Sequence, residues 1–95
     1  MGIRSFKDED VEHFFRHGKV PRKKGWSSIC KIARRKLDML HYAKVLRDLK
    51  SPPSNHLEAL DENLEGFYSI RVNDQWRIVF KWDEEPYDVQ IMDYH

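Results

Sequence analysis

Apolar side chains recur at helical spacing through the first half of this 95-residue chain. A first helix is predicted between Asp8, which can cap it, and Gly18, which can end it. Its apolar face would consist of Val11, Phe14 and Phe15. A longer second helix is predicted from Ser27 or Ser28 to about Ala43. Its apolar face would consist of Ile29, Ala33, Leu37 and Leu40.

The apolar spacing changes from helical to alternating after the consecutive prolines Pro52 and Pro53. The expected strands cover residues 2–6, 56–60, 67–73, 74–82 and 87–95, and a short helical turn is expected at 43–49. Consecutive strands joined by short turns favour an antiparallel meander. The order of elements therefore predicts a single α+β domain over residues 1–95, with two helices packed on a sheet.

Charge is unevenly distributed along the chain, although the net charge is only +1. Residues 1–50 contain 14 lysines and arginines against 6 acidic residues, whereas residues 51–95 contain 3 and 10. A basic half favours a polyanionic partner, but a solvated helix surface would explain the pattern equally well. The basic residues that could contact a nucleic-acid backbone are Arg22, Lys23, Lys24, Lys31, Arg34, Arg35 and Lys36.

Several classes of protein are disfavoured by composition. The single cysteine, Cys30, can form neither an internal disulfide nor a zinc-binding cysteine pair. Apolar runs are too short to span a membrane, and the N-terminus has no signal-peptide region, so a cytoplasmic location is expected. His13 and His17 are four residues apart on the first helix, but no third ligand is nearby, so no metal site is predicted.

Arg71 and Arg77 are candidates for anion binding, because they lie on consecutive predicted strands separated by a short turn. Two guanidinium groups there could bind a phosphate through bidentate hydrogen bonds. Alternatively, each arginine forms an ion pair with a carboxylate, and their positions alone favour this second interpretation. The candidate carboxylates are Glu58, Asp74 and Asp93.

Tyr94 and His95 follow the last predicted strand directly and end the chain. An imidazole is the natural proton shuttle at neutral pH. Cleavage of RNA needs a base for the 2′-hydroxyl, cations that stabilise charge on phosphorus and an acid for the leaving oxygen, and it needs no metal or cofactor. By position alone, a frayed and functionless terminus explains these two residues better.

Several segments of the chain together resemble the HigB-type toxins of the RelE/ParE superfamily of bacterial type II toxin–antitoxin systems. These segments are IRSFKDEDVEHFF, RKLDML, LRDLKSPPSNHLEAL, YSIRVNDQWRIVFKW and MDYH, and they occur in the family's order over nearly the whole sequence. The stretch SIRVNDQWRIVF and the terminal DYH are the most specific.

The resemblance implies a RelE-like microbial RNase fold, with an N-terminal strand and two helices packed on a twisted, mostly antiparallel sheet of four to five strands. It implies a toxin that cleaves mRNA in the ribosome and that is neutralised by a cognate helix-turn-helix antitoxin resembling HigA, whose complex binds operator DNA. By matched position, the resemblance implies catalytic roles for Arg71, Arg77, Tyr94 and His95. His56 stands where family members often have an RNA-binding arginine.

One segment departs from the family's pattern. Family members commonly have a segment resembling Leu-x-Gly-Asn/Asp-Arg-x-Gly between the second and third strands, and here it reads Leu60-Asp61-Glu62-Asn63-Leu64-Glu65-Gly66. The turn glycine is replaced by Glu62 and the usual arginine by Leu64, and Asp61 stands where some members have lysine. The basic loop has thus become acidic, so weakened RNA binding and weakened cleavage are expected.

The sequence leaves two alternative functions. The acidic loop is compatible with a catalytically degenerate toxin homologue that titrates its antitoxin and modulates operator repression. A gyrase poison, as in the ParE branch, is disfavoured by the terminal Tyr94 and His95.

Overall fold

A computed structural model describes residues 2–93, in which two helices precede a small sheet. The helices are α1 (Glu9–His17) and α2 (Cys30–Tyr42), and α2 is preceded by the 3-10 turn η1 (Gly25–Ile29). Further short turns are η2 (Leu46–Lys50), η3 (Pro53–Asn55) and η4 (Glu62–Leu64). The strands are β1 (Glu58–Ala59), β2 (Tyr68–Arg71), β3 (Trp76–Asp83) and β4 (Glu85–Asp93).

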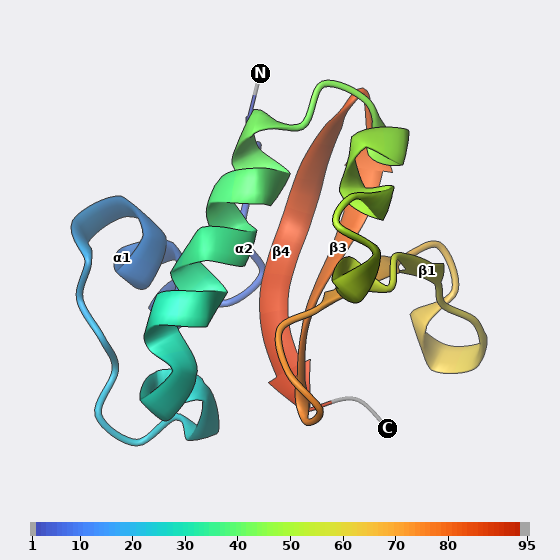
Figure 1. The fold of residues 1–95 in the computed structure, drawn as a ribbon. Helices are drawn as coiled ribbons and strands as arrows, with labels where there is room; N and C mark the ends of the chain where they lie inside the picture. Colours follow the sequence, from blue (N-terminus) through green and yellow to red (C-terminus); the bar gives the residue numbers. More distant parts are fainter. Residues whose placement is uncertain (1, 94–95) are drawn as a thin grey trace.

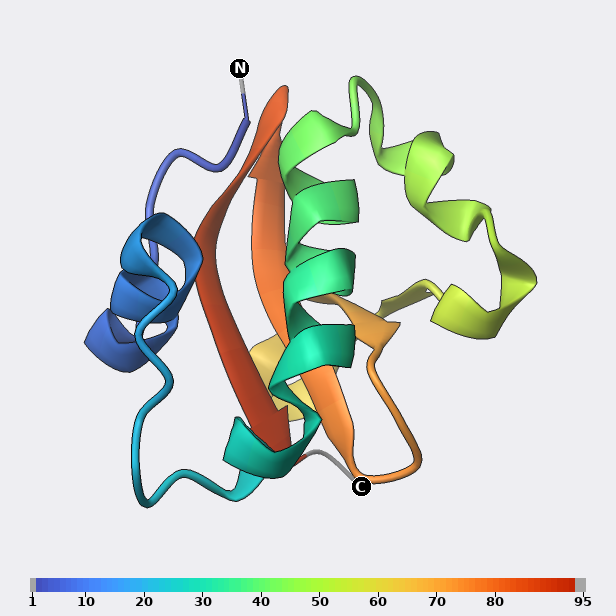
Figure 2. The ribbon, with the colours of Figure 1, turned by 60° about the vertical axis from the view of Figure 1, so that its left-hand side comes forward.

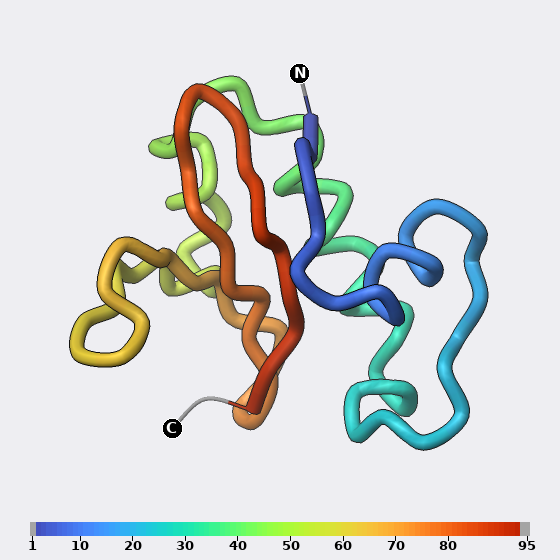
Figure 3. The backbone as a smooth tube through the Cα atoms, turned by 180° about the vertical axis from the view of Figure 1, so that it is seen from behind, coloured from blue at the N-terminus to red at the C-terminus, as the bar shows by residue number. Residues whose placement is uncertain are grey.

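The four strands form one antiparallel sheet in the order β1-β2-β3-β4, which confirms the predicted meander. Figures 1 and 2 show α2 running across one face of this sheet, with α1 beside it. Figure 3 shows the opposite face, which no described helix covers. The α+β fold class predicted from the sequence is therefore confirmed. Among the described residues, no helix is long and apolar enough to cross a membrane.

Local signals explain where the two helices begin and end. The Asp8 carboxylate accepts a hydrogen bond from the backbone N–H of Asp10 at 2.9 Å, and Gly18 ends α1 in the left-handed region at φ 71°. The start of α2 differs from expectation. Residues 25–29 form a 3-10 turn first, and the Ser27 hydroxyl donates to the Pro21 carbonyl instead of capping the helix. The regular helix therefore begins at Cys30.

The N-terminal segment is not the strand that was expected. It lies along β4 (Figure 3), but it forms only one isolated parallel bridge, between Phe6 and Val89. Pro86 has no N–H to offer the segment, and Asp88 has a left-handed φ of 51° with its N–H bonded to the Ser5 hydroxyl. These two residues interrupt the edge of β4, so a continuous ladder cannot form.

The predicted strand at 56–60 is shortened to the two residues of β1. His56 before it and Glu62 after it both have left-handed φ values, 45° and 56°. Both residues leave the extended region, and the pairing with β2 is confined to the two residues Glu58 and Ala59 that lie between them. The short β1 still pairs in register with β2, which places Glu58 opposite Ser69.

Alternation along the strands separates two apolar clusters. The larger cluster lies between the inner face of the sheet and the helices. Its buried members include Leu37 and Leu40 from α2, Trp26 from η1, and Ile70, Ile78, Phe80 and Ile91 from the sheet. The outer face has a smaller cluster formed by Leu60, Phe67 and Val79, with Leu64 and Met92 beside it. The larger cluster accounts for most of the buried apolar surface, so it supplies most of the hydrophobic stabilisation.

The irregular segment before β1 is fastened to α2 by a buried polar contact. Lys36 Nζ donates to Asn55 Oδ1 at 2.5 Å, and the Asn55 amide donates to the carbonyls of Leu49 at 3.1 Å and Ser51 at 3.3 Å. Burial lowers the pKa of the Lys36 ammonium, and the charge of Arg35 acts in the same direction. Asn55 thus joins α2 to two backbone positions of the irregular segment.

Replacing Asn55 by alanine should destabilise the fold by about 3 kcal/mol, because it removes the buried hydrogen bonds to the Lys36 ammonium and the Leu49 carbonyl. Urea unfolding followed by tryptophan fluorescence measures this loss. The matched control is Asn63→Ala, since Asn63 is exposed on the 61–65 loop. Equal urea midpoints for Asn55→Ala and the parent chain would contradict the role assigned to this contact.

Candidate functional site on the outer face of the sheet

Arg71 and Arg77 are direct cross-strand partners in the β2–β3 pair. Paired residues of antiparallel strands project to the same face of a sheet. Ser69 and Val79 are the next such pair along the ladder, so they lie on that face as well. Because Val79 belongs to the outer cluster, the two arginines lie on the outer face, which the helices leave uncovered.

Arg77 is held by three groups from the segment before β3. Its Nη1 donates to the Ser69 hydroxyl at 2.8 Å and to the His56 carbonyl at 3.3 Å, and its Nη2 donates to Glu58 Oε1 at 3.2 Å. The Arg77 side chain is only 16% exposed, so its orientation is well fixed. A guanidinium has five N–H donors, so two remain for a bound anion.

Arg71 has a looser arrangement, because its only ion-pair partner among the described residues is the Asp74 carboxylate in the β2–β3 turn. The Asp74 side chain is 95% exposed, and ion pairs of this kind contribute little to stability. An incoming phosphate could therefore replace Asp74 at small cost, since charge-assisted bidentate hydrogen bonds to phosphate are stronger.

The ion pairs considered from the sequence are thus present for Glu58 and Asp74. Asp93, the third candidate, accepts a hydrogen bond from the Gln75 amide at 3.0 Å. Asp93 is paired with Trp76, directly beside Arg77 in the β3–β4 ladder, so the described part of β4 ends next to the arginines. Tyr94 and His95, predicted as catalytic, lie outside the described residues.

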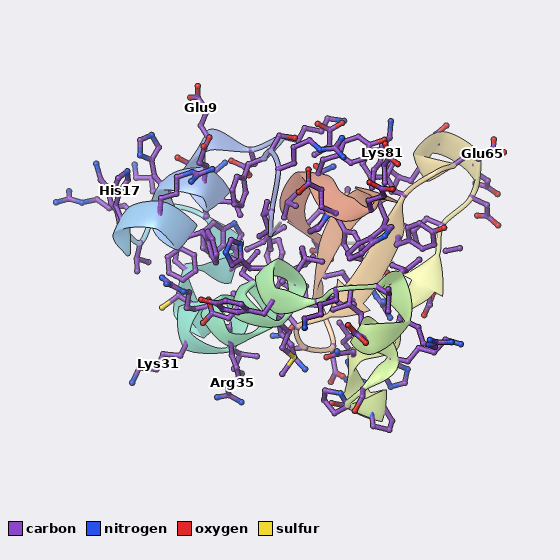
Figure 4. All side chains as sticks on the ribbon, turned by 90° about the horizontal axis from the view of Figure 1, so that it is seen from above. Glu9, His17, Lys31, Arg35, Glu65 and Lys81 are labelled. Atoms are coloured by element: carbon purple, nitrogen blue, oxygen red, sulfur yellow. The ribbon has the colours of Figure 1, made fainter. Side chains whose placement is uncertain are left out.

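Apart from His56, the basic residues predicted to bind RNA lie on α2 or in the loop before η1, and none is on the strands that carry the arginines. Figure 4 shows Lys31 and Arg35 on the side of the molecule formed by α2, away from Lys81 on the sheet. Arg34 pairs with Asp38 at 3.3 Å, and Lys24 in the loop before η1 pairs with Asp10 at 3.2 Å. The exposed members of this set are Arg22, Lys23, Lys24, Lys31 and Arg35. Lys36 is buried, so it cannot contact RNA.

His56 joins the arginine site through its backbone, since its carbonyl accepts a hydrogen bond from Arg77. Its side chain is exposed and remains accessible to a ligand. The acidic loop of residues 61–65 projects from the sheet beyond β1 and β2 (Figure 3), and its carboxylates are exposed. No ion pair joins this loop to either arginine in the described part of the chain.

Glu58 is a candidate functional residue that sequence reasoning treated only as an ion-pair partner. It projects to the outer face opposite Ser69, its side chain is 52% exposed, and it contacts Arg77. A carboxylate so placed can accept a proton from a group bound at Arg77. The alternation of residues 56–60 was the available signal, but the left-handed His56 hides the register of this segment.

No metal site is formed by the described residues, in which no three histidine, cysteine or acidic side chains are grouped. The His13 and His17 ring centroids are 5.9 Å apart on α1, with no third ligand beside them. Cys30 is a free, half-buried thiol at the start of α2, packed against the core.

Comparisons with known proteins agree with this architecture. Residues 4–95 match the family described as RelE-like toxin of type II toxin-antitoxin system HigB. The chain is 43% identical over 81 residues to Toxin HigB-1 of Vibrio cholerae, covering 81% of this chain and 80% of the relative. It is 37% identical over 94 residues to an uncharacterised protein of Haemophilus influenzae, covering 95% and 88%.

A solved structure, the YoeB-YefM complex from Staphylococcus aureus, has a similar fold. Its TM-score is 0.58 with 20% identity, over 100% of this chain and 97% of that chain. The family match spans almost every residue, and it includes both arginine-bearing strands and the final strand. This chain therefore belongs to the HigB family of RelE-like toxins of type II toxin–antitoxin systems.

Proposed function

We propose that this protein is a ribosome-dependent mRNA endonuclease that inhibits translation. The observation that carries the proposal is the placing of Arg71 and Arg77 opposite each other on the open face of the sheet, with Glu58 in contact with Arg77. Two guanidinium groups and a carboxylate supply the charge stabilisation and one of the proton acceptors that RNA cleavage requires. Family membership supports the same activity.

The reaction is an attack of a ribose 2′-hydroxyl on the adjacent phosphorus. The new O–P bond gives a 2′,3′-cyclic phosphate, and the bond to the 5′ oxygen of the next nucleotide breaks. Arg77 and Arg71 stabilise the additional negative charge on the phosphoryl oxygens. A base takes the 2′-hydroxyl proton and an acid protonates the leaving oxygen, so the protons balance without a metal or cofactor.

Glu58 and His95 are the pair to which we assign these proton transfers. Glu58 is ion-paired to Arg77, so it is held close to any phosphate that Arg77 binds. His95 acts as general acid or base, with Tyr94 positioning or assisting, as the family pattern implies. The ladder supports this assignment, because β4 pairs beside Arg77 up to Asp93.

The proposed partners are the ribosome with its mRNA and a cognate helix-turn-helix antitoxin resembling HigA, with operator DNA bound only through the toxin–antitoxin complex. The similar solved structure is a complex of YoeB with YefM, which supports an antitoxin partner. Lys31 and Arg35 of α2 lie away from Lys81 on the sheet (Figure 4), so they would contact a different nucleic-acid segment, such as ribosomal RNA. We place this activity in the cytoplasm.

A second candidate is favoured by one observation. Both arginines already pair with carboxylates, and the nearby loop has three further exposed acidic residues: Asp61, Glu62 and Glu65. These charges oppose RNA binding. A degenerate toxin that binds and titrates its antitoxin without cutting mRNA would show this arrangement as well.

Loss of Arg77 or His95 should abolish mRNA cleavage. The chain is induced in cells without antitoxin, and mRNA 5′ ends and growth are recorded. Arg77→Ala and His95→Ala should lose at least about a hundredfold in cutting, because each removes a group that acts in the transition state. Arg47→Ala, at an exposed site in η2, is the matched control. Growth arrest by both site variants at the parent level would refute the catalytic assignment, and absence of cuts from the parent chain would favour the antitoxin-titrating function.

Glu58→Gln should lower the cleavage rate by about a hundredfold or more without weakening RNA binding, because the amide keeps the shape and removes a negative charge but cannot accept the proton. Single-turnover cleavage of mRNA on purified ribosomes gives the rate constant, and the dependence of that rate on toxin concentration gives the affinity. Glu65→Gln, at an exposed position of the 61–65 loop, is the control. A Glu58→Gln rate equal to that of the parent would exclude this carboxylate as an acid or base.

Neutralising the charge of the 61–65 loop should strengthen cleavage. The double variant Asp61→Lys with Leu64→Arg removes one negative charge and adds two positive ones, so the charge of residues 61–65 changes from −3 to 0. Each change of a close charge pair is worth on the order of 1 kcal/mol in screened solvent, or about fivefold in affinity. Cleavage at limiting toxin concentration is the measurement. Unchanged cutting would show that the loop does not face the RNA.

A further inference from the structure

Two lysines from distant parts of the sequence converge on the ring of Phe67. Lys7 Nζ lies 5.5 Å from the ring centroid and Lys81 Nζ lies 4.9 Å from it. Both ammonium groups are therefore within about 10 Å of each other, at cation–π distance from one ring. Lys81 is in β3, and Lys7 is fixed to the edge of β4 by its backbone N–H, which donates to the Val89 carbonyl at 2.9 Å.

Neither lysine is neutralised within the part of the chain that the structure describes. No ion pair joins Lys7 or Lys81 to a carboxylate anywhere in residues 2–93, although several of the other lysines and arginines do pair. Gathering two like charges costs Coulomb energy, which the negative face of one aromatic ring offsets only in part. Such a pair is suited to an anion that the described chain does not itself supply.

The lysine pair shares a face with the arginine site. Phe67 and Val79 belong to the outer cluster, and Val79 lies between Arg77 and Lys81 on β3. Four residues of a strand span about 13 Å, so a phosphate at Lys81 is separate from the one at Arg77. Phe67 is only 8% exposed, so it supports the two ammonium groups rather than stacking on a base.

We propose that Lys7 and Lys81 form a second phosphate subsite on the outer face, which binds the backbone of the same single-stranded RNA beside the linkage held at Arg71 and Arg77. The subsite rests on the proposed endonuclease function and deepens it. Its contacts are to phosphate alone, so it fixes the register of the strand without reading its bases.

An RNA strand fits this face better than an acidic protein segment does. Arg71, Arg77 and Lys81 lie on neighbouring strands, and Lys7 lies beside the edge of β4. No described helix covers this face (Figure 3), and a sugar-phosphate backbone repeats its charge at regular intervals. The subsite also compensates for the acidic 61–65 loop, because its two lysines supply cationic contacts in place of those that a basic loop would make. Binding of an acidic antitoxin surface to the same lysines is the competing outcome.

The test uses salt-dependent binding of two uncleavable probes, a 2′-O-methyl oligoribonucleotide of about ten nucleotides, a typical site size for single-strand binding, and the corresponding dinucleotide. The variants are Lys7→Gln and Lys81→Gln, and Lys50→Gln in η2 is the exposed control. For the long probe, each subsite variant should reduce the slope of log affinity against log salt by about 0.7, the value per phosphate of a single strand. Lys81→Arg should retain the slope. Binding of the dinucleotide, which reaches only the arginines, should be unchanged.

Three results would overturn the subsite. The first is a parental salt slope in both glutamine variants, and the second is an equal loss of affinity for the long probe and the dinucleotide. The third is a loss of antitoxin binding with parental binding of RNA. Each variant's urea midpoint shows whether it is folded. The proposed cleavage is tested separately, by mapping mRNA cuts made by the unmutated chain. Parental cutting with salt slopes unaffected by the lysines would reject only the subsite, and lysine-dependent binding without cuts would reject only the nuclease.

Discussion

The antiparallel register between β2 and β3 is the constraint on which the candidate site depends. It places Arg71 opposite Arg77 on a face that the helices leave open, and a shift of β3 by one residue against β2 would turn the Arg77 side chain towards the packed core. The register is fixed from the other side of the sheet, where Ile70 and Ile78 pair and are fully buried. Hydrophobic burial on one face thus determines electrostatic geometry on the other.

The site also depends on irregular backbone. Arg77 is oriented by groups on residues 56–69, and the segment that leads to them is fastened to α2 through the buried Lys36–Asn55 contact. That contact fixes the position of η3, after which the left-handed His56 turns the chain into β1. A polar contact far from the candidate chemistry therefore determines how the carbonyl of His56 and the carboxylate of Glu58 meet Arg77.

Sequence periodicity anticipated the elements whose packing is strong and missed those that depend on single backbone conformations. The alternation of residues 67–82 correctly separated the inner Ile70 and Ile78 from the outer Arg71 and Arg77, because one face is buried. The shortened β1, the interrupted N-terminal strand and the 3-10 turn before α2 carry no periodic signal. Alternation along β3 puts Lys81 on the face of Arg77, but its proximity to Lys7 is a tertiary contact between residues 74 positions apart.

The central claim is that the paired arginines of the outer face bind the phosphate of RNA. Its most direct measurement is an NMR titration of the arginine Nε–Hε resonances with an uncleavable 2′-O-methyl dinucleotide. Resonances of Arg71 and Arg77 should shift together and saturate, because the phosphate replaces Asp74 and uses the remaining donors of Arg77, while Arg4 and Arg16, both ion-paired elsewhere, stay unchanged. Saturable binding that moves neither Arg71 nor Arg77 would contradict the claim.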